Sequence, residues 1–142
     1  MTQSPLIQNY IKMFRNYATF TGRASRSEFW WAFLMNYIVT FVLQFITRFL
    51  SSIITTIGSS NSTLLALFLA LSSALSGIYA LIIFVPMLAL QIRRLHDTDR
   101  SGWWIWFSGT GIGAIILLIW YCKSGAEDTN LFGSDPNPIR QY

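Results

Sequence analysis

The sequence is poor in charge, and its few charged residues are unevenly placed. Charged side chains make up 11% of the 142 residues, against about 25% in an average soluble domain. None lies between Arg48 and Arg93, so residues 49–92, a run of 44 positions, carry no formal charge. A soluble domain of this size needs a largely polar surface and could not cover such a stretch. The composition argues against a soluble enzyme, a nucleic-acid-binding module or a disordered chain, and it predicts an integral membrane protein.

The chain also has few of the residues that build metal or covalent sites. Its single cysteine, Cys122, excludes an internal disulfide and a cysteine-based zinc or iron–sulfur centre. Its single histidine, His96, excludes a site with several histidine ligands. We therefore predict no metal and no cofactor. The first 28 residues lack the apolar run of a signal peptide.

The segments that are present predict an all-α membrane protein with an N-terminal interfacial amphipathic helix and three transmembrane helices. Residues 4–19 alternate apolar and polar side chains at helical spacing, with Ser4 as N-cap, which is typical of a helix on the bilayer surface. Packing against the protein itself is the alternative. Three apolar segments of spanning length follow, and then a polar tail. These segments cover residues 29–47, 64–90 and 103–121, and the tail covers 122–142.

Local signals refine the three spans. Ser25 and Glu28 have the spacing of a capping box, so the first helix should begin near Arg26. The linker between the first two spans has its tip at residues 58–62. The second span would reach about 40 Å if upright, so it should tilt or bend at Pro86. The glycines at 109, 111 and 113 predict a flexible point or a close helix contact in the third span, with a short re-entrant bend as the minor alternative.

The basic residues predict the orientation of the chain in the membrane. With three spans, the N-terminal segment and the 91–104 loop share one side and hold seven of the ten basic residues. Cytoplasmic loops are enriched in Lys and Arg, so the N-terminus should be cytoplasmic and the C-terminus outside. A bent third span would instead return the tail to the cytoplasmic side.

The two basic loops should bring five guanidinium groups together at one interface. One interpretation is a salt-bridged collar that ties the ends of the spans together. The other is a site for a phosphate-bearing ligand, most simply an anionic lipid headgroup, because guanidinium groups bind phosphate through paired hydrogen bonds. The candidate ligand-binding residues are Arg23, Arg26, Arg93, Arg94, His96 and Arg100, and the neighbouring acids are Glu28, Asp97 and Asp99.

The 91–104 loop leads to further expectations for individual residues. If the second helix extends through Asp97, then Arg93 and Asp97 form an i, i+4 pair. Asp99 or Ser101 can cap the helix that follows. His96 beside Asp97 suggests catalysis, but that chemistry needs a nucleophile or a metal, and the sequence shows neither in a defined arrangement. We therefore predict no enzyme activity, and we interpret His96 as a hydrogen-bonded or interfacial side chain, with pH sensing as an alternative.

Three stretches carry a resemblance to a known family: FTGRASRSEFWWAFL (20–34), RRLHDTDRSGWW (93–104) and NLFGSDP (130–136). They resemble the signatures of the bacterial membrane family catalogued as domain-of-unknown-function family 805, the YhaH-like inner-membrane proteins. The similarity covers nearly the whole chain. The chain departs from the family pattern at Asp128, where glycine is frequent, and around Ser108, where the family often has proline.

The resemblance implies a small multi-pass protein of the bacterial cytoplasmic (inner) membrane, and it supplies no reaction. If the tail folds back, Asn130 and Asp135 could join the Arg/His/Asp cluster as structural partners. The favoured function is non-enzymatic binding of anionic membrane lipid, a membrane partner protein or a second copy of the chain, and not of nucleic acid. The alternatives are an oligomeric small transporter or channel and, less favoured, an interfacial enzyme that uses His96 and Asp97.

Overall fold

The computed structural model describes residues 5–56, 62–126 and 129–136, and these residues are almost entirely helical. The predicted N-cap Ser4 and most of the predicted linker tip, residues 58–61, lie outside the described residues. A single isolated bridge joins Asn130 and Gly133 in the tail. The helices are α1 (Pro5–Arg15), α2 (Arg26–Thr56), α3 (Ser62–Asp97), the 3-10 helix η1 (Gly102–Gly109) and α4 (Gly111–Cys122).

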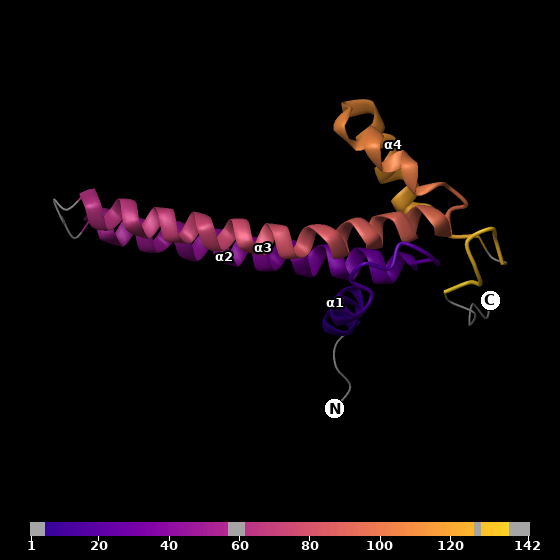
Figure 1. Cartoon of the computed structure of the whole chain (residues 1–142), viewed down its shortest axis with the longest axis horizontal. Coiled ribbons are helices and arrows are strands. Elements are labelled where there is room, and N and C mark those ends of the chain that lie inside the picture. The colour runs from indigo at the N-terminus through magenta and orange to yellow at the C-terminus, as the bar shows by residue number, and fades with distance from the viewer. Residues whose placement is uncertain (1–4, 57–61, 127–128, 137–142) are drawn as a thin grey trace.

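Helices α2 and α3 form a long antiparallel hairpin that dominates the shape of the molecule (Figure 1). They are the two described helices that are long and apolar enough to cross a membrane. Their 31 and 36 residues correspond to about 46 and 54 Å of helix, against about 30 Å of hydrocarbon. Both helices are therefore longer than the spans predicted at 29–47 and 64–90, and α3 carries the second basic segment as part of the helix.

Two hydrogen bonds explain where α2 begins and how α3 accommodates a proline. The backbone N–H of Glu28 donates to the Ser25 hydroxyl at 3.1 Å, which confirms the predicted helix start. Pro86 lies inside α3 without ending it. A proline leaves the carbonyl four residues earlier without its helical donor, and here the Tyr17 hydroxyl donates to that carbonyl, on Ile82, at 2.8 Å.

Helix α1 lies across the hairpin (Figure 1). Met13 is the fully buried residue of α1. The Tyr10 and Tyr79 hydroxyls lie 3.2 Å apart, and Tyr79 donates to the Asn36 side chain at 2.7 Å. Asn36 of α2 is therefore hydrogen-bonded to α3. The amphipathic helix predicted over 4–19 is described as the shorter Pro5–Arg15.

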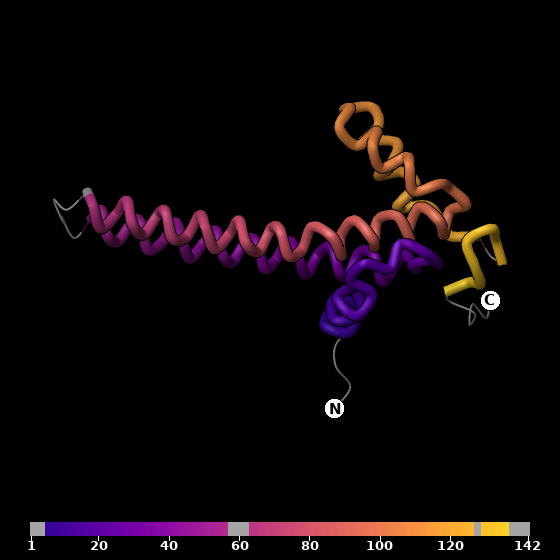
Figure 2. Tube along the Cα trace, in the orientation of Figure 1, coloured from indigo at the N-terminus to yellow at the C-terminus, as the bar shows by residue number. Residues whose placement is uncertain are grey.

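The prediction of one straight helix over 103–121 is wrong. The chain forms η1, breaks at Thr110 in extended conformation, and returns as α4, as the path of the tube in Figure 2 shows. Trp104 and Trp120, sixteen residues apart, would be about 24 Å apart on a straight helix, but their ring centroids lie 5.2 Å apart. The segment folds back on itself, and we call residues 102–122 the re-entrant arm.

The reason for the break lies in the glycines and Thr110. The Thr110 hydroxyl accepts a hydrogen bond from the N–H of Gly113 at 3.0 Å and so caps α4. A Cβ on Gly113 would overlap the carbonyl oxygen of Phe107, so only glycine lets the two halves of the arm approach here. Of the two expectations for these glycines, the close contact is therefore observed at Gly113.

The packed core lies at one end of the hairpin, where α1, the arm and the end of α3 meet. Toward the linker, large apolar side chains of α2 and α3 are exposed instead, as expected for helices surrounded by lipid. The buried core cluster consists of Met13, Ala24, Phe29, Ala32, Ile83, Met87, Leu90, Leu95, Ile105, Leu117 and Tyr121. The packing of this end fixes the position of the polar residues described next.

Candidate functional site: an arginine collar

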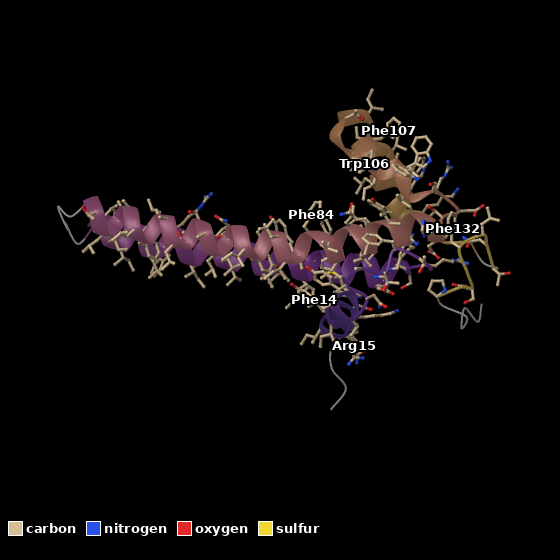
Figure 3. All side chains as sticks on the ribbon, in the orientation of Figure 1. Phe14, Arg15, Phe84, Trp106, Phe107 and Phe132 are labelled. Atoms are coloured by element: carbon tan, nitrogen blue, oxygen red, sulfur yellow. The ribbon has the colours of Figure 1, made fainter. Side chains whose placement is uncertain are left out.

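Side chains that carry nitrogen and oxygen gather at the end of the molecule where α3 finishes (Figure 3). At the centre is the carboxylate of Asp97, which binds two guanidinium groups. Arg23 Nη2 and Nε lie 2.9 and 3.0 Å from Asp97 Oδ1, and Arg94 Nη1 contacts Oδ2. All three side chains are buried. Burial of such charges is tolerated because they are paired and hydrogen-bonded.

Arg94 also holds the end of the re-entrant arm. Its Nε and Nη2 each lie 3.2 Å from the carbonyl oxygen of Tyr121, and Nη2 also donates to the carbonyl of Lys123. The last carbonyls of a helix lack donors within that helix, and a cation there also complements the helix dipole. Arg94 therefore caps α4 and fixes the arm against α3.

Arg23 and Asp97 bring the tail to the same place. Arg23 Nη1 donates to the carbonyl of Gly133 at 3.3 Å, and Nη2 donates to that of Ala126. The N–H of Ala126 donates to the Asp97 backbone carbonyl at 2.8 Å, and Asn130 Nδ2 donates to the His96 carbonyl, also at 2.8 Å. The described part of the tail therefore folds back onto the cluster, and Asn130 joins it, as expected for a bent third segment.

A second ion pair joins the collar to α1. Arg93 Nη1 lies 3.0 Å from Glu28 Oε1, and Lys12 Nζ lies 2.6 Å from Glu28 Oε2. The expected i, i+4 pair of Arg93 with Asp97 is therefore wrong, although α3 does extend to Asp97: Glu28 is the partner of Arg93, and Arg94 pairs with Asp97 at i+3. Arg93 Nε and Nη2 are buried and have no hydrogen-bond partner among the described residues.

We define the arginine collar as Arg23, Arg93 and Arg94 with their acids Glu28 and Asp97. Three of the candidate ligand-binding arginines are therefore paired with buried acids, as in a salt-bridged collar. Arg26 and Asp99 are exposed. Arg100 lies over the ring of Trp120, 4.3 Å from its centroid, where a cation is attracted by the ring. Asp135 is partly buried in the tail.

His96 lies at the rim of the collar, beyond the apolar part of α3. Its Nδ1 is 3.2 Å from the carbonyl oxygen of Gly22, and its ring stacks on Phe132 with a centroid distance of 4.0 Å. Burial lowers the pKa of His96 below its ordinary value. The carboxylate of Asp97 is directed to Arg23 and Arg94 instead. Of the two caps expected after α3, Ser101 is the one that accepts from a backbone N–H, that of Trp103.

Several contributors to the site could not be found from charged motifs. The carbonyls of Tyr121, Lys123, Ala126 and Gly133 are backbone groups, which any residue supplies. Gly125 packs so closely on Asp97 that a Cβ there would overlap the carboxylate. Within the described residues no group of three or more His, Cys, Asp or Glu side chains could hold a metal ion.

The fold and the collar together define a class of protein: a small helical protein in which one buried ion-pair cluster ties a hairpin of two long apolar helices to a crossing helix, a bent arm and a folded tail. Comparison with known proteins then places the chain. It belongs to the family described as protein of unknown function DUF805, which matches residues 17–134. The matched region contains the whole collar and the whole arm.

Two curated relatives from Escherichia coli K12 are similar over nearly their full length. Inner membrane protein YhaH is 37% identical over 128 residues, which cover 89% of this chain and 94% of the relative. Inner membrane protein YhaI is 39% identical over 131 residues, or 92% and 96%. No solved structure matches the chain. The chain is therefore a multi-pass protein of the bacterial inner membrane.

Proposed function

We propose that this protein is non-enzymatic and binds anionic lipid headgroups at its collar end, through exposed cations around the collar. The observation that carries the proposal is that some basic residues are buried in ion pairs while others are exposed. Glu28 and Asp97 pair with the buried arginines, so the remaining positive charge is at the surface. Among the described residues around the collar, the exposed or partly exposed cations are Lys12, Arg15, Arg26, Arg100 and Lys123.

The charge balance supports an anionic ligand. Outside positions 29–92, the sequence carries nine basic side chains and six acidic ones, a surplus of three. Basic residues near an anionic leaflet each contribute about 1 kcal/mol of attraction. Arg48 is the single charged residue of positions 29–92. The positive-inside rule therefore assigns the collar end, with both the N-terminal segment and the tail, to the cytoplasmic side.

Helix α1 suits the same interface. It lies across the hairpin (Figure 1), and Ile7 and Ile11 are exposed. Lys12 and Arg15 occupy its last turn, and the Lys12 side chain is 52% exposed even while it contacts Glu28. An amphipathic helix with apolar and basic faces binds in the plane of an anionic membrane surface. Lys12 and Arg15 would then lie at the depth of the phosphates.

The test compares cations at the two ends of the hairpin. Purified protein is reconstituted into nanodiscs of phosphatidylcholine with a minor fraction of pyrene-labelled phosphatidylglycerol, and enrichment of the label around the protein is measured by energy transfer from tryptophan. We expect the double variant Arg15→Gln/Arg26→Gln to lower the enrichment by up to about 30-fold, since two charges at about 1 kcal/mol each amount to about 2 kcal/mol. Added salt should weaken the wild-type enrichment.

The matched control is Arg48→Gln, which removes an exposed arginine from the same hairpin but away from the collar. Its enrichment should equal that of wild type. If Arg48→Gln and the double variant behave alike, or if the wild type shows no preference for phosphatidylglycerol, the proposal is wrong.

A further inference from the structure

We propose that the cavity between α3 and η1 binds one glycerophospholipid, with an acyl chain along the apolar wall and the head at His96 and Ser101. The inference rests on the proposed function for the charge of the head and adds a site for the chain. The cavity has a volume of about 540 Å³. Its apolar walls include Phe84, Leu88 and Ile92 of α3 and Trp103, Ile105 and Trp106 of η1.

The dimensions and surroundings of the cavity suit an acyl chain. From Phe84 to His96, α3 rises by about 18 Å, close to the thickness of one hydrocarbon leaflet, about 15 Å. Phe84 and Trp106, labelled on α3 and on the arm in Figure 3, are 64% and 76% exposed. Because the chain is an inner-membrane protein, apolar surface of this kind at the depth of the hairpin is covered by lipid.

The surroundings favour a hydrocarbon chain over a helix. A second apolar cavity, of about 340 Å³, is lined by residues of α2, α3 and the arm and shares Ser108 with the first. A flexible chain can follow the walls of such cavities, whereas a partner helix is a rigid cylinder about 10 Å across.

The polar end of the cavity offers one acceptor and one donor. A carbonyl oxygen can only accept, so His96 Nδ1, which contacts the Gly22 carbonyl at 3.2 Å, carries the hydrogen. Nε2 of the neutral ring is then an acceptor. The Ser101 hydroxyl accepts from the N–H of Trp103 at 3.4 Å and keeps its own hydrogen to donate. A glycerol hydroxyl and an ester or phosphate oxygen of a lipid head complement these two groups.

The polar and apolar ends of the cavity are placed as the head and the chains of a membrane lipid would be. The polar end, at His96 and Ser101, lies beside the collar, where the surplus positive charge is located, and the apolar wall runs from there along α3 toward Phe84. A phospholipid in the same leaflet places its phosphate and glycerol at that level and its chains below. Charge complementarity therefore selects an anionic phospholipid with a hydroxyl-bearing head, of which phosphatidylglycerol is the simplest.

The experiment counts lipid molecules retained by the protein. Protein purified in a mild detergent from phosphatidylglycerol-containing membranes is analysed by native mass spectrometry, and each variant is also checked by circular dichroism and gel filtration. We expect one phospholipid per wild-type chain. Ser108→Trp, which fills the cavity, should lower retention by roughly tenfold, the effect of losing about two methylene contacts.

The matched control is Ser52→Trp, the same exchange at an exposed serine of α2 that lines neither of the two apolar cavities. Its retention should equal that of wild type. A second variant, Trp106→Ala, removes one wall without adding bulk and should also lower retention, so a misfolded Ser108→Trp does not decide the outcome. No retained lipid in wild type, or equal retention in all three variants, overturns the inference.

The readout also separates this inference from the proposed function. Arg15→Gln/Arg26→Gln should change which headgroup is enriched around the protein while the retained lipid is still present. Ser108→Trp should remove the retained lipid while the headgroup preference of the surrounding bilayer persists. Normal retention in Ser108→Trp with a normal charge preference overturns the cavity site alone. If wild type retains a lipid but shows no preference for phosphatidylglycerol in the surrounding bilayer, the headgroup proposal alone is overturned.

Discussion

Arg23 Nη2 lies 2.9 Å from Asp97 Oδ1, across 74 positions of sequence. This contact joins the turn before α2 to the last residue of α3. Because Asp97 also binds Arg94, whose guanidinium holds the end of α4, one carboxylate connects the hairpin, the arm and the tail. The apolar hairpin can be held in the bilayer by its length and composition, whereas the arrangement of the arm and the tail depends on this buried acid.

Asp97→Asn should therefore destabilise the collar end strongly. The variant keeps the size of the side chain but leaves two buried guanidinium groups without their counter-charge, which typically costs about 3–5 kcal/mol. We expect a lower midpoint of thermal unfolding for the purified protein and faster proteolysis within residues 123–136. Asp99→Asn is the matched control, since Asp99 is exposed and has a positive φ of 58°, a conformation that asparagine tolerates. Similar losses in both variants would contradict a central role for Asp97.

The return of the arm predicts that both ends of the described chain are on one side of the membrane. In a background where Cys122 is replaced by serine, single cysteines at Ser27 and Ser134, both exposed, should react with a membrane-impermeant maleimide from the same side. The positive-inside rule predicts that this side is cytoplasmic, so both should be labelled only after the cells are permeabilised. Labelling of the two positions from opposite sides would contradict the return of the arm and support a straight third span.

The sequence predicted those parts of the fold that depend on local pattern. Hydrophobic length gave two helices, and the Ser25–Glu28 spacing gave the start of α2. The path of residues 102–122 was not predictable, because the glycines that permit a bend also permit close helix packing, and only the contact of Gly113 with Phe107 distinguishes the two.

The site was predicted only in part. Of the five arginines expected to meet, Arg23, Arg93 and Arg94 do so with Glu28 and Asp97, whereas Arg26 is exposed and Arg100 lies on Trp120. Which arginine binds which acid depends on the rotation of α3 and on the position of α1, and neither is set by local spacing. The carbonyl groups that take the remaining hydrogen bonds of Arg23 and Arg94 have no signature in side-chain chemistry.

His96 should make the stability of the collar end depend on pH. Burial lowers the pKa of His96 from its ordinary value of 6.5, so the folded state binds fewer protons than the unfolded state in the range just below that value. Stability should be constant above about pH 6.5 and fall as the pH decreases toward 5. The measurement is the thermal unfolding midpoint in detergent as a function of pH, for wild type and for His96→Gln. A slope that is unchanged in His96→Gln would assign the effect to other groups.

Gly113→Ala should open the re-entrant arm. A Cβ at this position would overlap the carbonyl oxygen of Phe107, whereas one on Gly111, two residues earlier, would meet nothing within 4 Å. Alanine favours a helix more than glycine by about 1 kcal/mol, so Gly111→Ala should be neutral or mildly stabilising, while Gly113→Ala must separate η1 from α4. The separation can be measured by cross-linking cysteines placed at Trp104 and Trp120, whose rings are in contact in the native arm. We expect efficient cross-linking with Gly111→Ala and a large loss with Gly113→Ala, and equal yields in the two would show that the bend does not depend on this glycine.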